Sequence, residues 1–202
     1  MKIKNWVLGA AAIVGLAGCS GSFEVAYEEG ISGSVTRNWD VVGVNVFTPR
    51  ELTVSNRNSL APNADIVWHG EPFGDRRAQV AAIVEDGIEA GTASMNGDQS
   101  VTISATVVHF HAVTPQAVSR APSAVHNIRF AIRAFDSATG EPLTPLEVIS
   151  ADLEAYTGAA AVAAAVEGQT QRVRIVDHIA RVTRGWLGQG PDMRRRFSSV
   201  GR

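Results

Sequence analysis

Cysteine is nearly absent from this chain of 202 residues, in which Cys19 is the only one. A single thiol cannot form a disulfide within the chain, so a packed core must stabilise the fold. Lysine is absent after Lys4, and the other basic residues are 16 arginines, against 20 acidic residues. A mildly acidic chain without a dominant basic face argues against nucleic-acid binding, and we expect no nucleic-acid partner.

Long hydrophobic runs are also missing. The longest, residues 6–17, has 12 residues, whereas a membrane-spanning helix needs about 20. This run follows Lys2 and Lys4 and ends in small residues, which is the order found in a secretory signal peptide. Its end, Leu16-Ala17-Gly18-Cys19, resembles the lipobox of bacterial lipoproteins. We therefore predict that residues 1–18 are a lipoprotein signal peptide.

The lipobox resemblance implies a role for Cys19. In such lipoproteins the thiol receives a diacylglyceryl group, the chain is cut before the cysteine, and the new amine takes a further acyl chain such as palmitate. Ser20 follows the cysteine, and in that family a serine there is compatible with export to the outer membrane. We expect a lipid-anchored protein of the cell envelope that faces the periplasm from the outer membrane. The alternative is an ordinary signal peptide with a chance or buried cysteine.

The composition of residues 19–202 predicts three segments: a tether, a folded domain and a tail. Residues 19–38 are rich in Gly, Ser and Glu without a clean period, which predicts a lipid anchor followed by a flexible tether. Residues 39–187 are expected to form a single α+β domain. Residues 188–202 begin with glycines and proline and include three consecutive arginines, which predicts a disordered tail.

Hydrophobic periodicity predicts strands and helices within the domain. The expected elements, in chain order, are a strand at 39–47, a helix at 75–92, strands at 101–113, 125–135 and 146–153, and a helix at 167–187. Gly87 and Gly91 would let the first helix approach a sheet closely. The predicted fold is an α+β two-layer sandwich, with a mostly antiparallel sheet of about four strands and two amphipathic helices on one face, in the order β-α-β-β-β-α.

Three histidines form the candidate polar or ligand site. His109 and His111 are two residues apart and share one face of a strand. If a hairpin closes near residue 118, His126 on the next strand would lie near His111. Three imidazoles can bind zinc or copper. The alternative is a polar end of the sheet that is hydrogen-bonded to backbone or carboxylates, and we expect neither a resident metal nor another cofactor.

Catalytic motifs are missing from the sequence. It contains no G-x-S-x-G, no P-loop, no H-E-x-x-H and no G-x-G-x-x-G after a strand, so we expect no enzyme. Arg129 and Arg133 would share one strand face as a basic strip. This strip is either a docking surface or a set of arginines paired with neighbouring carboxylates.

Several stretches together resemble one family. They are Ile66-Val67-Trp68, the strand that ends in HFHA at residues 109–112, the hairpin loop at 136–140, and GQTQRVRI at 168–175. They are similar to DUF6778, a family of alphaproteobacterial lipoproteins, over about residues 38–187. This resemblance implies no activity and no catalytic residues. The element order and the HFHA strand also resemble, more weakly, the auxiliary lipoproteins of ABC-type envelope transporters.

These observations favour a membrane-anchored periplasmic lipoprotein that acts as a non-enzymatic binding or auxiliary module. We expect an envelope protein as the partner, and the weaker resemblance to ABC-type auxiliary lipoproteins implies a role in an envelope transport system. The alternative is a carrier of a small ligand or metal, using the helix–sheet interface or the cluster of His109, His111 and His126.

Overall fold

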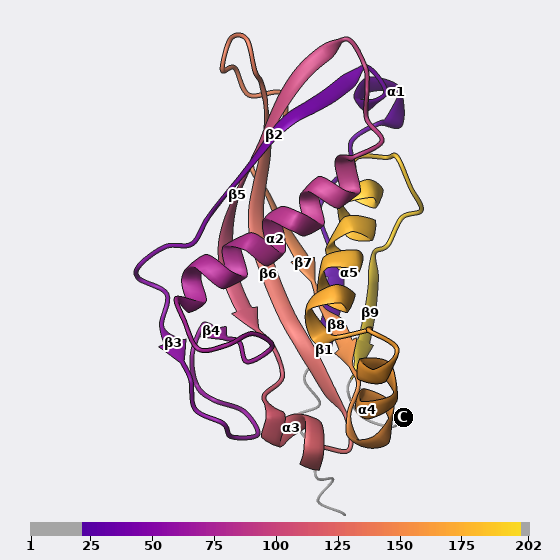
Figure 1. Cartoon of the computed structure of the whole chain (residues 1–202). Helices are drawn as coiled ribbons and strands as arrows, with labels where there is room; N and C mark the ends of the chain where they lie inside the picture. The colour runs from indigo at the N-terminus through magenta and orange to yellow at the C-terminus, as the bar shows by residue number, and fades with distance from the viewer. Residues whose placement is uncertain (1–21, 199–202) are drawn as a thin grey trace, which may run out of the picture.

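The computed structural model describes residues 22–198, so the predicted signal peptide and Cys19 lie outside the described part of the chain. Within that part, nine strands belong to one mixed sheet and five helices accompany it (Figure 1). The strands are β1 (Ser22–Ala26), β2 (Trp39–Phe47), β3 (Val54–Ser55), β4 (Ile66–Val67), β5 (Gln99–His111), β6 (Ala124–Asp136), β7 (Glu147–Ala151), β8 (Leu153–Ala155) and β9 (Arg195–Ser198). The helices are α1 (Gly33–Thr36), α2 (Arg76–Thr92), α3 (Pro115–Arg120), α4 (Gly158–Val166) and α5 (Gln171–Trp186).

The centre of the sheet is the long antiparallel pair β5–β6. On one side, β2 runs parallel to the first part of β5 and β4 runs parallel to its end, with β3 parallel to β4. On the other side, β7 pairs antiparallel with β6, and β1 and β9 follow in antiparallel order. The short β8 also pairs with β6. The sheet therefore mixes parallel and antiparallel pairs.

The predicted four-stranded, mostly antiparallel sheet with two helices is wrong. The prediction missed β3, β8 and β9, which have two to four residues and are too short to show a period. Such strands form because a partner supplies hydrogen bonds and side-chain contacts, and a single sequence does not show that partner. The parallel pairing of β2 with β5 follows from the crossover through α2, which returns the chain to the same end of the sheet.

The expected tether and tail belong in large part to the domain. β1 lies between β7 and β9 in the sheet. The backbone N–H of Ile31 donates to the carbonyl of Trp186 at 2.6 Å, and the buried hydroxyl of Thr36 donates to the carbonyl of Leu187 at 2.7 Å. These bonds fix residues 22–38 against the end of α5. The boundaries predicted at 39 and 187 are therefore too narrow.

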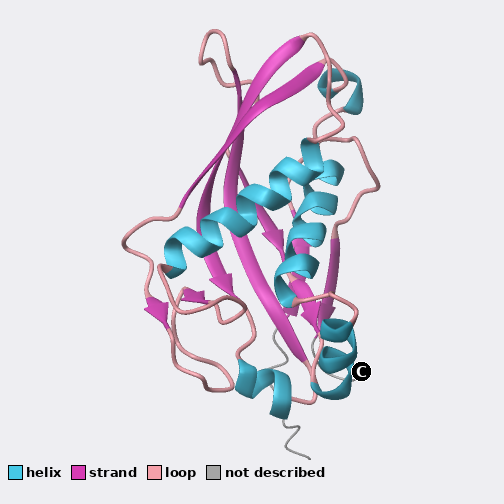
Figure 2. Ribbon diagram, viewed as in Figure 1, coloured by secondary structure: helices cyan, strands magenta, loops and turns pink. Residues whose placement is uncertain are grey.

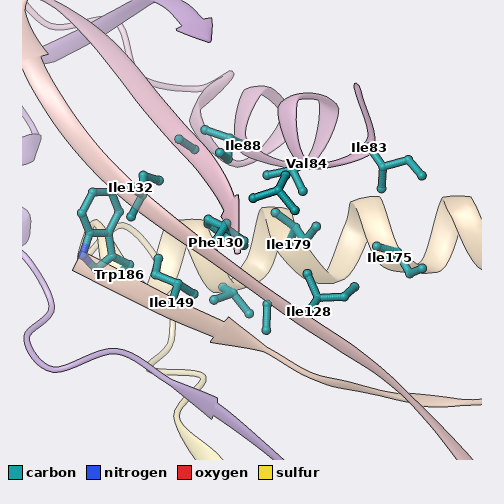
Figure 3. Close-up of a cluster of buried hydrophobic side chains, with 14 of the residues drawn as sticks. Ile83, Val84, Ile88, Ile128, Phe130, Ile132, Ile149, Ile175, Ile179 and Trp186 are labelled. Carbon is teal, nitrogen blue, oxygen red and sulfur yellow. The ribbon is translucent and has the colours of Figure 1, made fainter. Parts of the chain in front are cut away.

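Two helices cover one face of the sheet (Figure 2). α2 and α5 pack against each other and against β6, and their isoleucines and valines meet Ile128, Phe130 and Ile132 (Figure 3). A Cβ atom added at Gly87 would lie 2.6 Å from the Cβ of Ile179 in α5. The glycines of α2 therefore allow a close approach to α5, rather than to the sheet as predicted.

Candidate functional site

The opposite face of the sheet carries a row of side chains that runs across four strands. Phe47, Thr106, Ala131 and Val148 are successive Cα partners on β2, β5, β6 and β7. Phe47, at the end of β2, is 61% exposed, and Val148, on the interior strand β7, is 52% exposed. We call this surface the open face, defined by Asn45, Phe47, Ser104, Thr106, His109, His111, Asn127, Arg129, Ala131, Arg133 and Val148. Exposed apolar groups on one face of a sheet mark a candidate interaction surface.

Two arginines flank the apolar row on the open face. Arg129 is paired in register with His109, and Arg133 with Ser104. The guanidinium of Arg133 donates to the carbonyl of Thr144 at 2.9 Å. Among the described residues, no carboxylate forms a salt bridge with either arginine. The basic strip predicted on this strand face is present. Neither arginine forms a salt bridge within residues 22–198, although the charge of Arg129 acts on nearby Asp152 and favours the ionised form of that carboxyl.

The structure brings two of the three candidate histidines together. His109 and His111 lie on the open face with ring centroids 5.9 Å apart. His126 is fully buried on the opposite side of the sheet, and Asn127 is the residue that pairs with His111. The reason is a bulge in β5 between Val107 and His109, which shifts the register by one residue. Without that bulge, His111 would pair with His126, as predicted from the hairpin. The three imidazoles therefore do not form one site.

His126 instead belongs to a buried pair with His178 of α5. The backbone N–H of Val113 donates to Nδ1 of His126 at 3.4 Å. The Nε2 atoms of His126 and His178 are buried, and no described residue offers either a hydrogen bond. Burial, with smaller effects from nearby Arg174 and His178, lowers the pKa of His126 to about 3. Burial, with nearby Arg181 and Arg195, lowers the pKa of His178 to about 4. Both imidazoles are neutral at neutral pH.

Asp152 is a buried carboxylate that no pattern in the sequence singled out. It accepts hydrogen bonds from the amide of Asn127 at 2.9 Å and from the backbone N–H groups of Ile128 and Glu24, both at 3.0 Å. Burial raises the pKa of Asp152, while these donors act in the opposite direction. The three bonds join β1 to β6, so the carboxylate holds the sheet together.

In residues 22–198, no group of three or more His, Cys, Asp or Glu side chains is arranged to hold a metal ion. A concavity of about 250 Å³ lies beside the open face and is lined mainly by small and apolar side chains, with His111, Asn127, Phe23 and Leu60 among them. None of the helices in the described part has the length and hydrophobicity needed to cross a bilayer.

The fold is a single domain in which helices cover one face of a mixed sheet and leave the other face open. Residues 39–202 match the model of DUF6778, a family of unknown function, and the chain belongs to this family. The family resemblance predicted from the sequence is thus confirmed, and the match extends to residue 202.

Comparison with solved structures gives distant similarities. A Caulobacter crescentus protein described as a lipoprotein is 10% identical, with a TM-score of 0.37, over 77% of this chain and 96% of that chain. A variant of the PelC dodecamer from Paraburkholderia phytofirmans is 14% identical, with a TM-score of 0.33, over 77% and 95%. A Xanthomonas campestris protein of the family DUF330 is 14% identical, with a TM-score of 0.41, over 74% and 82%. No curated protein matches the chain.

Proposed function

We propose that this protein is a lipid-anchored, non-enzymatic binding module of the bacterial cell envelope. Cys19 carries the lipid, the domain faces the periplasm from the outer membrane, and the open face docks an envelope protein. The lipobox at residues 16–19 supports the anchor. We further propose that the docked protein belongs to an envelope transport system.

The observation that carries the docking role is the exposed apolar row on the open face. Phe47 and Val148 leave more than half of their surface in water, at an energetic cost that a protein partner would remove. Arg129 and Arg133 flank this row and form no salt bridge with a described residue. An apolar centre with arginines at its rim is typical of a protein interface. The matching partner surface would be apolar, with carboxylates at its edge.

A second candidate function is carriage of a small apolar ligand. The concavity beside His111 favours it, because its lining is mainly apolar and about 250 Å³ is close to the size of small-ligand sites. The helix–sheet interface does not favour it, since that space is filled by buried side chains (Figure 3). Native mass spectrometry of the protein from its own membranes distinguishes the two functions, because a carrier would retain a bound small molecule.

In-cell photo-crosslinking tests the docking role. A photoreactive amino acid at Val148 should give an adduct with one envelope protein, and Arg129→Glu should weaken that adduct by removing a rim cation. The matched control places the same amino acid at Glu89, which is exposed on α2, on the helix-covered side. Equal adducts from both positions, or none from Val148, would overturn the docking role.

A further inference from the structure

Helix α4 is a short apolar helix that the fold leaves largely uncovered. Its sequence, GAAAVAAAV, contains no polar or charged side chain, and only Ala164 is buried. Val162 is 66% exposed and Val166 is 85% exposed. These two valines are four residues apart, so they share one face of the helix. Alanine-rich helices are stable in water, but an entirely apolar exposed helix on a folded domain calls for a partner.

α4 lies beside the point at which the described chain begins. Ala160 of α4 and the neighbouring Tyr156 line a concavity of about 270 Å³ together with Ser198 at the end of β9. Ser198 is in turn the Cα partner of Ser22, the first residue of β1. Figure 1 shows α3, α4 and the end of β9 at the same end of the molecule. The apolar helix and the start of β1 are therefore neighbours.

Covalent geometry places the predicted lipid close to this end. Cys19 precedes Ser22 by three residues, and a chain extends by at most about 3.6 Å per residue. The acylated residue therefore lies within about 11 Å of Ser22. Since the acyl chains of Cys19 enter the bilayer, the end of the domain that carries α4 must lie at the membrane surface.

We propose that α4 is a membrane-contacting helix, whose exposed valines enter the boundary between headgroups and acyl chains of the lipid bilayer that holds Cys19. The proposal rests on the lipidation of Cys19 under the proposed function. Nine residues are too few to span a membrane, so the helix lies on the surface rather than across it. Tyr156, which is 47% exposed beside the helix, suits the same interface because its ring is amphipathic.

The charges at this end are compatible with a membrane surface. Arg120 ends α3, which packs beside α4, and it is exposed. Arg195 of β9 is exposed as well, and neither arginine forms a salt bridge with a described residue. Each arginine close to an anionic membrane surface adds favourable electrostatic energy. Glu167, the exposed C-cap residue of α4, and Glu154 beside the concavity are also at this end, so the two arginines offset these acidic groups and an anionic bilayer surface can lie against the apolar helix.

The single cysteine gives a direct experiment. Once Cys19 is acylated, an introduced cysteine is the only free thiol, so a fluorophore sensitive to polarity can be placed at one chosen position. Val162→Cys and Val166→Cys report on α4, and Ala138→Cys is the matched control in the exposed β6–β7 hairpin, at the other end of the molecule (Figure 1). The full-length lipoprotein is reconstituted into vesicles of phosphatidylethanolamine and phosphatidylglycerol, with and without lipids that carry a doxyl quencher.

The expected result is that the label on α4 loses about half of its emission to the quencher lipids, whereas the label at Ala138 loses almost none. Vesicle flotation and the intact mass are measured on the same samples. Suppose that the protein is acylated and floats, but the fluorophores on α4 and at Ala138 report the same water-exposed surroundings. This result overturns the membrane contact of α4 and leaves the lipid anchor at Cys19 in place. A fluorophore at Val162 that is shielded from water but not quenched by the doxyl lipids would show that another protein copy covers α4. This result also overturns the proposal. If the protein carries no acyl chains, the proposed function itself fails.

Discussion

Ser22 and Ser198 are Cα partners at the ends of β1 and β9. The pair stands at the start of a ladder in which Phe23 faces Phe197, with ring centroids 6.2 Å apart, and Arg196 forms a salt bridge with Glu24 at 3.2 Å. The two ends of the described chain therefore close one edge of the sheet. Residues 22–26 of the predicted tether are therefore part of the sheet, so the anchor proposed at Cys19 precedes the first strand by only three residues.

Deletion of residues 195–202 should destabilise the domain. β1 pairs with β7 through only two residue pairs, so β9 supplies most of its backbone partners. We expect a loss of about 1–3 kcal/mol in the free energy of unfolding, measured by urea denaturation. Replacing Arg195 and Arg196 by serine within the intact chain is the control, because it keeps the strand. An unchanged urea midpoint after deletion would support the disordered tail predicted from sequence.

Gly87→Ala should destabilise the protein even though alanine favours helices. The added methyl group would lie 2.6 Å from Cβ of Ile179, so α2 and α5 would have to separate. Overpacking of this kind costs about 1–3 kcal/mol, which exceeds the gain of about 1 kcal/mol in helix propensity. Glu89→Ala on the exposed face of α2 is the control and should change little. A Gly87→Ala protein with a raised melting temperature would contradict the packing described for these helices.

Asp152→Ala should be among the more destabilising single changes. It removes the acceptor of three hydrogen bonds and leaves the buried backbone N–H of Ile128 without a partner. The expected cost is about 2–4 kcal/mol, read from urea denaturation. Asp177→Ala breaks an exposed salt bridge with Arg181 and should cost less than about 1 kcal/mol. Equal costs for the two variants would show that Asp152 does not hold β1 to β6.

Stability should fall as the pH is lowered from about 7 to about 4. In the unfolded chain a histidine titrates near 6.5, whereas burial lowers the pKa of His126 to about 3 and that of His178 to about 4. The unfolded state therefore binds more protons in this window, which favours unfolding at low pH. Asp152 acts in the opposite direction, because burial raises its pKa and the folded state takes up its proton first.

The variant His126→Asn isolates the contribution of this histidine to the pH dependence of stability. The side-chain oxygen of the asparagine can still accept the hydrogen bond from the backbone N–H of Val113. Each pH unit contributes at most about 1.4 kcal/mol for one histidine. The variant should therefore lose less stability than the wild type between neutral and mildly acidic pH. His111→Asn is the control, since His111 lies half-buried on the open face whereas His126 is fully buried. Parallel pH profiles for wild type and His126→Asn would contradict the buried neutral imidazole.

Long periodic elements could be predicted from the sequence, because their hydrophobic pattern records the face they bury. The helix expected at 75–92 is α2 at Arg76–Thr92, with Asp75 as its N-cap, and the strands expected at 101–113 and 125–135 are β5 and β6. Strands β1 and β9 could not be predicted, since they pair with each other across about 170 residues of sequence.

The candidate site was harder to predict than the long elements. The alternation in β5 placed His109 and His111 on one face, which the structure confirms. The position of His126 depended on one extra residue in β5, and a sequence pattern does not reveal a bulge that only the paired strand defines. The open face itself is a property of the assembled sheet, because it joins residues from four strands.

The lipid anchor at Cys19 is tested most directly by the intact mass and the membrane location of the protein. Both are measured after expression in a lipoprotein-processing bacterium and compared with the Cys19→Ala variant. We expect the wild-type chain to begin at Cys19, to carry three acyl chains and to fractionate with the outer membrane. We expect the Cys19→Ala variant to be released from the membrane. The lipid anchor would be contradicted by a wild-type chain that keeps a free thiol at Cys19 and is found in the soluble periplasmic fraction in the same amount as the variant.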